Sequence, residues 1–195
     1  MDRLLDEIES YWSTRTEGYS EVNEKELKGM QKKAWLKTLE SGFLEKKLSD
    51  NDKEQLRILD IGTGPGFFPM ILAEAGYHVT AVDYTPGMLE KAAENAAKFI
   101  GEKSSNIEFK RMDAQALEFE DESFDVIISR NLTWTLPHVS HAYGEWLRVL
   151  KKGGRFLCST YGRRHMCEIS TLVQEFDSRI VLSAEKLYER FGLEN

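Results

Sequence analysis

Three glycines fall within five positions of the stretch LDIGTGPGFF, residues 59–68, directly after Asp60 and a short apolar run. Glycine adopts backbone conformations, and allows close approaches, that a Cβ atom forbids. In open α/β sheets, ligands bind outside the carboxyl ends of the strands, next to such turns. The stretch therefore predicts a buried strand, a tight turn that passes under a ligand, and a helix.

The residues around this turn alternate between strand and helix patterns. Strands are expected over 57–60, 78–82, 107–111, 124–129 and 155–160, and helices over 66–75, 86–100 and 139–151. Pro86 suits the first turn of its helix, and Gly153-Gly154 predicts a turn before the fifth strand. Because helical crossovers imply parallel pairing, the expected fold class is α/β, with a Rossmann-like, doubly wound and mostly parallel sheet.

Two helices are expected ahead of this core, over 2–17 and 24–48, with a break at Glu17-Gly18-Tyr19-Ser20. A chain of this length is sufficient for a single domain with a core. The expected division is residues 1–50 as an N-terminal helical cap or lid, residues 51–162 as the core and residues 163–195 as a C-terminal helical segment.

The composition argues against several classes of partner. A formal net charge of −7 disfavours nucleic acid, because duplex binding depends on Lys and Arg that neutralise phosphates. The apolar runs are too short for a membrane span, and no signal-peptide pattern opens the sequence. Cys158 and Cys167 provide neither a disulfide framework nor a four-ligand zinc site, so no metal is expected. These features predict a cytoplasmic protein.

The glycine spacing separates the known classes of nucleotide loop. Dinucleotide-binding folds use G-x-G-x-x-G, and here Phe67 occupies the position of the third glycine. A phosphate-binding P-loop is excluded because no Gly-Lys-Ser/Thr follows. What remains is an acidic residue followed by G-x-G-x-G, from Asp60 to Gly66.

Further motifs follow this one in order: an aspartate ends the second strand, another ends the third, and Arg130-Asn131 closes the fourth. From about residue 55 to 160 the sequence resembles the class I S-adenosylmethionine-dependent methyltransferases. The resemblance implies the strand order 3-2-1-4-5 and S-adenosyl-L-methionine as cofactor, with S-adenosyl-L-homocysteine as product. The residues expected to bind the cofactor are Asp60, Gly62, Thr63, Gly64, Gly66, Asp83, Tyr84, Met88, Asp113, Ala114, Arg130 and Asn131.

The resemblance also implies separate roles for these residues. Asp83 would accept hydrogen bonds from both ribose hydroxyls, although a helix cap is an alternative for it. Asp113 would receive the adenine amino group, while the N–H of Ala114 would meet a ring nitrogen. Tyr84 and Met88 would flank the adenine, and core packing is the alternative for Met88.

The reaction implied by the resemblance is an in-line displacement at a sulfonium methyl group, for which positioning and exclusion of water supply most of the rate. An acceptor that carries a proton needs a base, and His138 and His141 are candidates, with exposure to solvent as the alternative. Tyr19 is the candidate lid residue, or else an aromatic staple to the core. The candidate acceptor-binding residues are Trp134, Tyr11 and Trp12.

The sequence departs from the family after Thr160, where 35 residues remain. They predict a helix near 164–176, a short run at 180–182 and a helix near 184–191, with no room for the antiparallel hairpin that closes the family's sheet. We therefore expect a truncated C-terminus and an exposed fifth strand through which two copies could pair as a homodimer.

The leading functional hypothesis is methyl transfer to a small-molecule acceptor. The alternatives are methylation of RNA or protein, and cofactor binding without catalysis; an NAD-dependent oxidoreductase is the weakest. The Asn-Pro-Pro-Tyr motif of amino-methylating nucleic-acid enzymes is absent after the fourth strand, where Ser129-Arg130-Asn131-Leu132 stands. The acceptor and its nucleophilic atom stay open, because variable loops build acceptor pockets.

Overall fold

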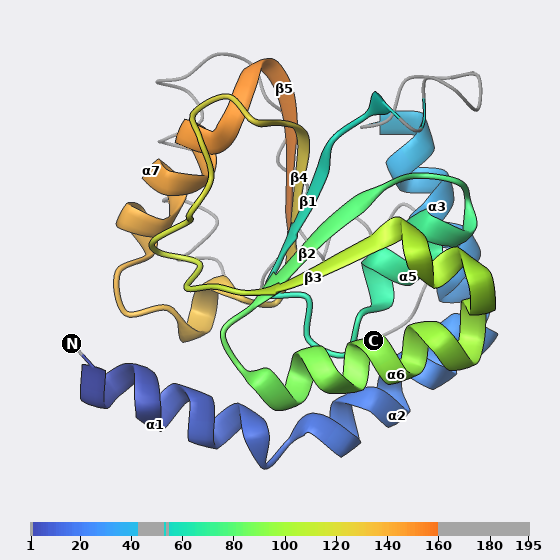
Figure 1. Cartoon of the computed structure of the whole chain (residues 1–195), viewed down its shortest axis with the longest axis horizontal. Coiled ribbons are helices and arrows are strands. Elements are labelled where there is room, and N and C mark those ends of the chain that lie inside the picture. Colours follow the sequence, from blue (N-terminus) through green and yellow to red (C-terminus); the bar gives the residue numbers. More distant parts are fainter. Residues whose placement is uncertain (1, 43–52, 54, 160–195) are drawn as a thin grey trace.

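Five strands form the central sheet of the computed structural model, which describes residues 2–42, 53 and 55–159 (Figure 1). Their order is β3-β2-β1-β4-β5, and every neighbouring pair is parallel. The strands are β1 (Ile58–Ile61), β2 (Val79–Asp83), β3 (Ile107–Arg111), β4 (Phe124–Arg130) and β5 (Leu150–Ser159). The expected fold class and strand order are confirmed.

Helices cover both faces of this sheet (Figure 1). They are α5 (Phe67–Glu74), α6 (Pro86–Ile100) and α7 (Val139–Val149), with 3-10 turns η1 (Gly101–Asn106) and η2 (Thr133–Thr135). Side chains alternate along β1, so Leu59 and Ile61 pack with Trp146 of α7 while Ile58 packs with Phe68 of α5. Because both faces are covered, β1 is buried along its whole length, as parallel strands usually are.

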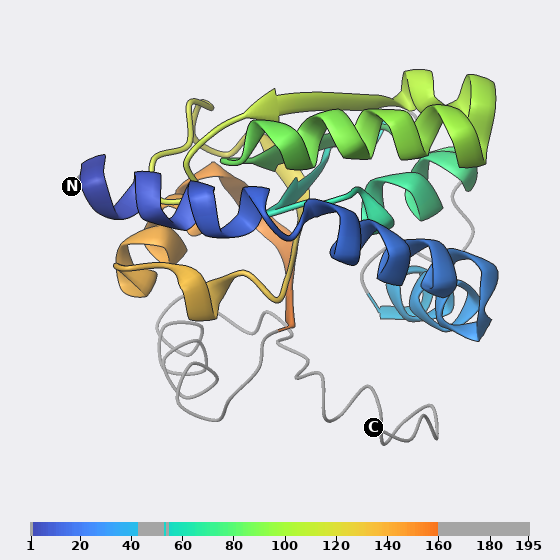
Figure 2. The same ribbon diagram turned by 90° about the horizontal axis from the view of Figure 1, so that it is seen from below.

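Three helices precede the sheet: α1 (Asp2–Ser13), α2 (Thr16–Lys28) and α3 (Met30–Gly42). Figure 2 shows α1 and α2 running across the molecule along one side of α6, with α3 beside α2. Figure 1 shows that they lie along the end of the sheet at which β1, β2 and β3 terminate. The N-terminal segment therefore covers the carboxyl ends of the strands, where α/β folds bind their ligands.

The expected break in the N-terminal segment at residues 17–20 is wrong. Helix α2 begins at Thr16 and runs through Gly18, and the chain leaves helical geometry at Gly29, whose ψ is −173°. A glycine inside a helix costs only about 1 kcal/mol, and tertiary contacts offset this cost. One such contact joins Ser20 Oγ to Asn95 Nδ2 of α6, at 3.0 Å.

The fifth strand also differs from the expected one. It begins at Leu150, and the glycines expected to form the preceding turn lie inside it. Phe124 pairs with Leu150 whereas Val126 pairs with Arg155, so the register shifts over this stretch. Gly153 has a φ of +77°, which permits the local irregularity. The glycine pair therefore produces a bulge within the strand.

The elements expected over 164–176, 180–182 and 184–191 lie outside the described residues, as does the end of the fifth strand after Ser159. Within the described part, no helix is long and apolar enough to cross a membrane.

Candidate functional site

A cavity of about 360 Å³ lies between the carboxyl ends of β1–β4 and the N-terminal helices. It brings together thirteen of the residues singled out in the sequence: Trp12, Tyr19, Asp60, Gly62, Thr63, Gly64, Asp83, Tyr84, Met88, Asp113, Ala114, Arg130 and Asn131. The roles assigned to them remain predictions, but their convergence follows from the parallel topology, which places all these strand ends at one edge.

The glycine turn after β1 uses its three glycines for different reasons. All three have positive φ, between +52° and +89°, which disfavours other residues. A Cβ on Gly62 would lie 2.8 Å from Leu132 Cδ2, and one on Gly66 would lie 3.1 Å from Ala92 Cβ. A Cβ on Gly64 would meet no protein atom within 4 Å, and Gly64 lines the cavity.

Gly66 is expected to bind the cofactor, and that role stays a prediction. It does not line the cavity but packs against α6, whose approach a side chain would obstruct. Of the three glycines, Gly64 is therefore the one that lines the cavity and has open space where a Cβ would stand.

Asp83 ends β2 with its carboxylate at the cavity wall. Oδ2 accepts the N–H of Gly64 and Oδ1 accepts the N–H of Thr85, both at 2.9 Å. Burial raises the pKa of Asp83, and these backbone hydrogen bonds oppose the rise. Since each carboxylate oxygen has two lone pairs, the same group can accept further hydrogen bonds from a ligand.

Asp60 lies beside it at the end of β1 and is only 2% exposed. Burial raises its pKa to about 7; the nearby Asp83 adds to the rise, while Thr63 and the charge of Arg130 oppose it. Carboxyl groups whose pKa is shifted toward 7 are common in the cavities of functional sites.

Asn95 of α6 is a buried residue that the sequence reasoning missed. Its Nδ2 donates to the carbonyl of Pro65 at 3.1 Å and also contacts Ser20 Oγ. It therefore ties the glycine turn to the helix α2 above it. A polar residue on the apolar side of an amphipathic helix was the available sequence signal.

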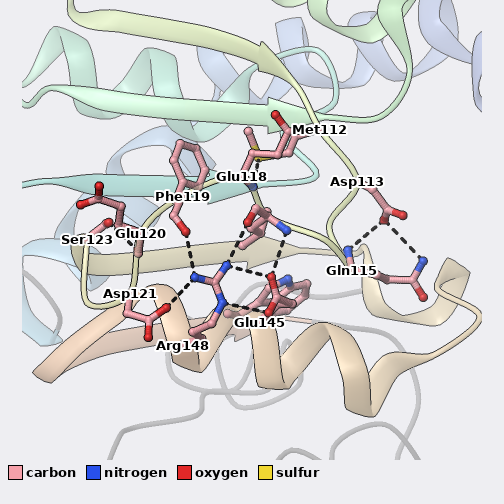
Figure 3. A network of polar contacts seen from close by, with 12 residues as sticks. Met112, Asp113, Gln115, Glu118, Phe119, Glu120, Asp121, Ser123, Glu145 and Arg148 are labelled. Carbon is pink, nitrogen blue, oxygen red and sulfur yellow. Dashed lines mark hydrogen bonds and ion pairs between the residues drawn. The ribbon is translucent and has the colours of Figure 1, made fainter.

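The loop after β3 carries Asp113 and Ala114 and is held against α7 (Figure 3). Trp146 Nε1 donates to the carbonyl of Ala114 at 2.7 Å. Arg148 donates to the carbonyls of Leu117 and Phe119, at 2.9 and 2.8 Å. The helix α7 thus fixes the backbone next to the predicted adenine contact.

Four aromatic side chains form a cluster around Trp12, which lines the cavity. The ring of Trp12 makes edge contacts with Tyr11, Tyr19 and Trp134, at centroid distances of 5.2, 5.2 and 5.8 Å. Trp12 and Tyr19 line the cavity, whereas Tyr11 and Trp134 do not and are 43% and 41% exposed. The structure therefore places Tyr11 and Trp134 behind the lining, as supports for Trp12.

The two candidate bases lie elsewhere. His138 and His141 are exposed at the start of α7, and neither lines the cavity. The backbone N–H of His138 donates to Gln115 Oε1 at 3.0 Å, which fixes its main chain. Their positions match the alternative of solvent-facing histidines. Among the described residues there is also no group of three or more His, Cys, Asp or Glu able to hold a metal ion.

Glu26 of α2 completes the cavity wall and was missed because nothing in its local sequence marks it. It forms a two-point ion pair with Arg130, which follows from tertiary contact between residues 104 positions apart.

Comparison with known proteins identifies a family. Residues 59–158 match the family model described as a methyltransferase domain. The ubiquinone/menaquinone biosynthesis C-methyltransferase UbiE of Zymomonas mobilis is 33% identical over 129 residues, which cover 66% of this chain and 52% of the relative. The arsenite methyltransferase of Halobacterium salinarum is 38% identical over 105 residues, 52% of this chain and 26% of the relative.

A solved structure agrees with these relatives. The YcgJ protein of Bacillus subtilis matches with a TM-score of 0.50 and 28% identity, over 72% of this chain and 61% of that one. The chain spans about half the length of the UbiE relative. Because the domain match covers more than half of the chain and contains every strand-end motif of the cavity, the chain belongs to the class I S-adenosylmethionine-dependent methyltransferases.

Proposed function

We propose that the chain binds S-adenosyl-L-methionine in this cavity and transfers its methyl group to a small organic acceptor by in-line displacement. The observation that carries the proposal is the convergence of three strand ends on one cavity: the glycine turn after β1, Asp83 at the end of β2 and Asp113 after β3. The family membership and the small-molecule acceptor in the UbiE relative's name support the same reaction class.

The residues present fit the cofactor. The cavity volume of about 360 Å³ is within the usual range for small-ligand sites. Gly64 leaves bare backbone where the ligand would lie, and Asp83 can accept hydrogen bonds from hydroxyl groups. The bound cofactor would supply an electrophilic methyl group on a sulfonium. The chain has to orient the reactants, and the lid residues Trp12 and Tyr19 would exclude water.

The lining near the lid favours an apolar or flat acceptor. Leu5 and Ile8 of α1, together with Leu136 after β4, contribute apolar surface to the cavity.

Arsenite, which appears in the name of the Halobacterium relative, has affinity for thiolates. The described cysteine, Cys158, is fully buried and does not line the cavity, and burial raises its pKa to about 12.

Calorimetric titration with S-adenosylhomocysteine tests the cofactor assignment. We expect one binding site per chain and a loss of roughly 10- to 100-fold in affinity for Asp83→Ala, from the loss of charge-assisted hydrogen bonds. Asp6→Ala, at an exposed position of α1, serves as the matched control and should bind like the parent chain. A folded chain that binds NAD and not S-adenosylhomocysteine would overturn the proposal.

The homodimer and the cytoplasmic location are also proposals. In the described sheet β5 forms one edge, beyond β4, and an open edge is a template for pairing. A dimer mass by light scattering is expected, and a monomer at all concentrations would remove the idea. The low number of cysteines supports a reducing compartment.

A further inference from the structure

An ion pair joins the lid to the sheet at the wall of the cavity. Arg130 Nη1 donates to Glu26 Oε2 at 2.8 Å, and Nη2 donates to Oε1 at 2.6 Å. The two side chains are only 14% exposed for Glu26 and 18% for Arg130, and both line the cavity. Burying such a pair costs desolvation energy that its own attraction offsets only in part, so a further partner in the cavity would explain its position.

The guanidinium of Arg130 is held in place by aromatic rings. It lies over the rings of Phe67 and Trp35, at 5.3 and 5.5 Å from their centroids. Such stacking suits a planar cation, which is then presented in a fixed orientation. Its charge also acts on Asp60, so this part of the cavity holds one cation among carboxylates.

The ion pair lies on the other side of β1 from the predicted nucleoside contacts. Asp83 and Asp113 follow β2 and β3, whereas Arg130 ends β4, on the opposite side of β1. A ligand whose adenosine contacts the β2 and β3 ends would extend past the glycine turn toward Arg130. The group at that end of S-adenosylmethionine is an α-amino acid, which carries one carboxylate and one ammonium.

We propose that the pair of Glu26 and Arg130 is the receptor for this amino-acid group, with Arg130 facing the carboxylate and Glu26 facing the ammonium. A zwitterion gives each member of the pair a partner of opposite charge, whereas a ligand with a single charge would leave one member opposed. The assignment rests on the proposed function, and it adds Glu26, a residue of the lid, to the cofactor site.

The consequence is selectivity for the intact cofactor. Because Glu26 belongs to α2, a bound amino-acid group also fastens the lid, and a nucleoside without that group would not. The sharpest probe is therefore 5′-methylthioadenosine, which keeps the adenosine and the sulfur but lacks the amino acid.

The test compares two ligands on two variants by calorimetry. Glu26→Gln keeps the shape of the side chain and removes its charge, and we expect at least a 10-fold loss of affinity for S-adenosylhomocysteine with less than a 2-fold change for 5′-methylthioadenosine. Glu24→Gln is the matched control on the same helix, where Glu24 contacts Lys28 and Lys98 at the surface, and it should change neither affinity.

Three outcomes decide the matter. An equal loss for both ligands would identify the pair as a structural clamp and overturn the assignment, as would an unchanged affinity for S-adenosylhomocysteine. If the parent chain binds neither ligand, the proposed function itself fails. Should Glu26→Gln not fold, Arg130→Lys, which keeps the charge but not the two-point geometry, must show the same preferential loss for S-adenosylhomocysteine.

Discussion

At the scale of single residues, burial raises the pKa values of two aspartates of the cavity, Asp60 and Asp83. Asp60 and Asp83 end neighbouring strands, but Asp83 accepts two backbone N–H groups. Asp60 is more deeply buried, and its pKa rises to about 7 because the charged form loses hydration. Burial raises the pKa of Asp83 as well, and there the backbone hydrogen bonds oppose the rise.

The raised pKa of Asp60 predicts a dependence of stability on pH. Since the unfolded carboxyl ionises near 3.8 and the folded one near 7, the unfolded state binds fewer protons between these values. The parent chain should therefore lose stability relative to Asp60→Asn as the pH rises from about 4 to about 7. The total would be roughly 4 kcal/mol at most, at about 1.36 kcal/mol per pKa unit.

Urea unfolding at a series of pH values measures this difference in the free energy of unfolding. The gap between the two chains should grow up to neutral pH and then stay constant. Asp6→Asn, at an exposed site, is the control and should run parallel to the parent chain. A gap that is the same at pH 4.5 and pH 8 would contradict the prediction.

At the scale of elements, α7 acts as a support for the loop after β3. Glu145 accepts the N–H of Leu117, and Arg148 joins Glu145, Asp121 and two loop carbonyls (Figure 3). The pairing raises the pKa of Arg148 and lowers that of Glu145, so both stay charged near neutrality. The position of Asp113 in this loop thus depends on Glu145 and Arg148 of α7, although neither side chain lines the cavity.

Loss of this support should loosen the loop without unfolding the sheet. We expect Arg148→Met to speed amide hydrogen exchange over 113–123 and to weaken binding of S-adenosylhomocysteine roughly 3- to 10-fold, because carbonyls and carboxylates lose charged donors. The matched control is Lys152→Met, which removes a charge at a side chain that is 88% exposed. Faster exchange across β1 and β4 as well would show global destabilisation instead.

At the scale of the whole molecule, the N-terminal helices form a cover joined to the core by separate contacts. Glu26 binds Arg130 of β4, Ser20 binds Asn95 of α6, and Trp12 packs on Trp134 of η2. A ligand in the cavity lies between the cover and the sheet, so its binding should stabilise both together.

Binding should therefore protect the N-terminal segment from proteolysis. At a concentration of 100 times its dissociation constant, S-adenosylhomocysteine would add about 2.7 kcal/mol to the free energy of opening. We expect trypsin cleavage after Arg15 and Lys25 to slow roughly 100-fold, as followed by mass spectrometry. NAD at the same concentration is the control, and equal cleavage with and without S-adenosylhomocysteine would contradict a closing cover.

Local sequence patterns were sufficient for most of the fold. Strand and helix periods, Pro86 at a helix start and the aspartates at strand ends depend on residues that are near one another in the chain. The parallel topology then places those strand ends at one edge, so the predicted residues at and after the strand ends meet at the cavity. The family model over residues 59–158 confirms the assignment made from the same motifs.

The tertiary structure decided what depends on distant neighbours. Gly18 stays helical because α2 packs on α6, and Gly66 packs against Ala92 of α6 instead of lining the cavity. His138 and His141 are exposed and do not line the cavity, while Glu26 reaches it across 104 positions of the chain. The sequence by itself determined the sheet and the strand ends, because their signals are local. The placement of the N-terminal helices over the cavity and the pairing of Glu26 with Arg130 were decided by packing, which no local pattern encodes.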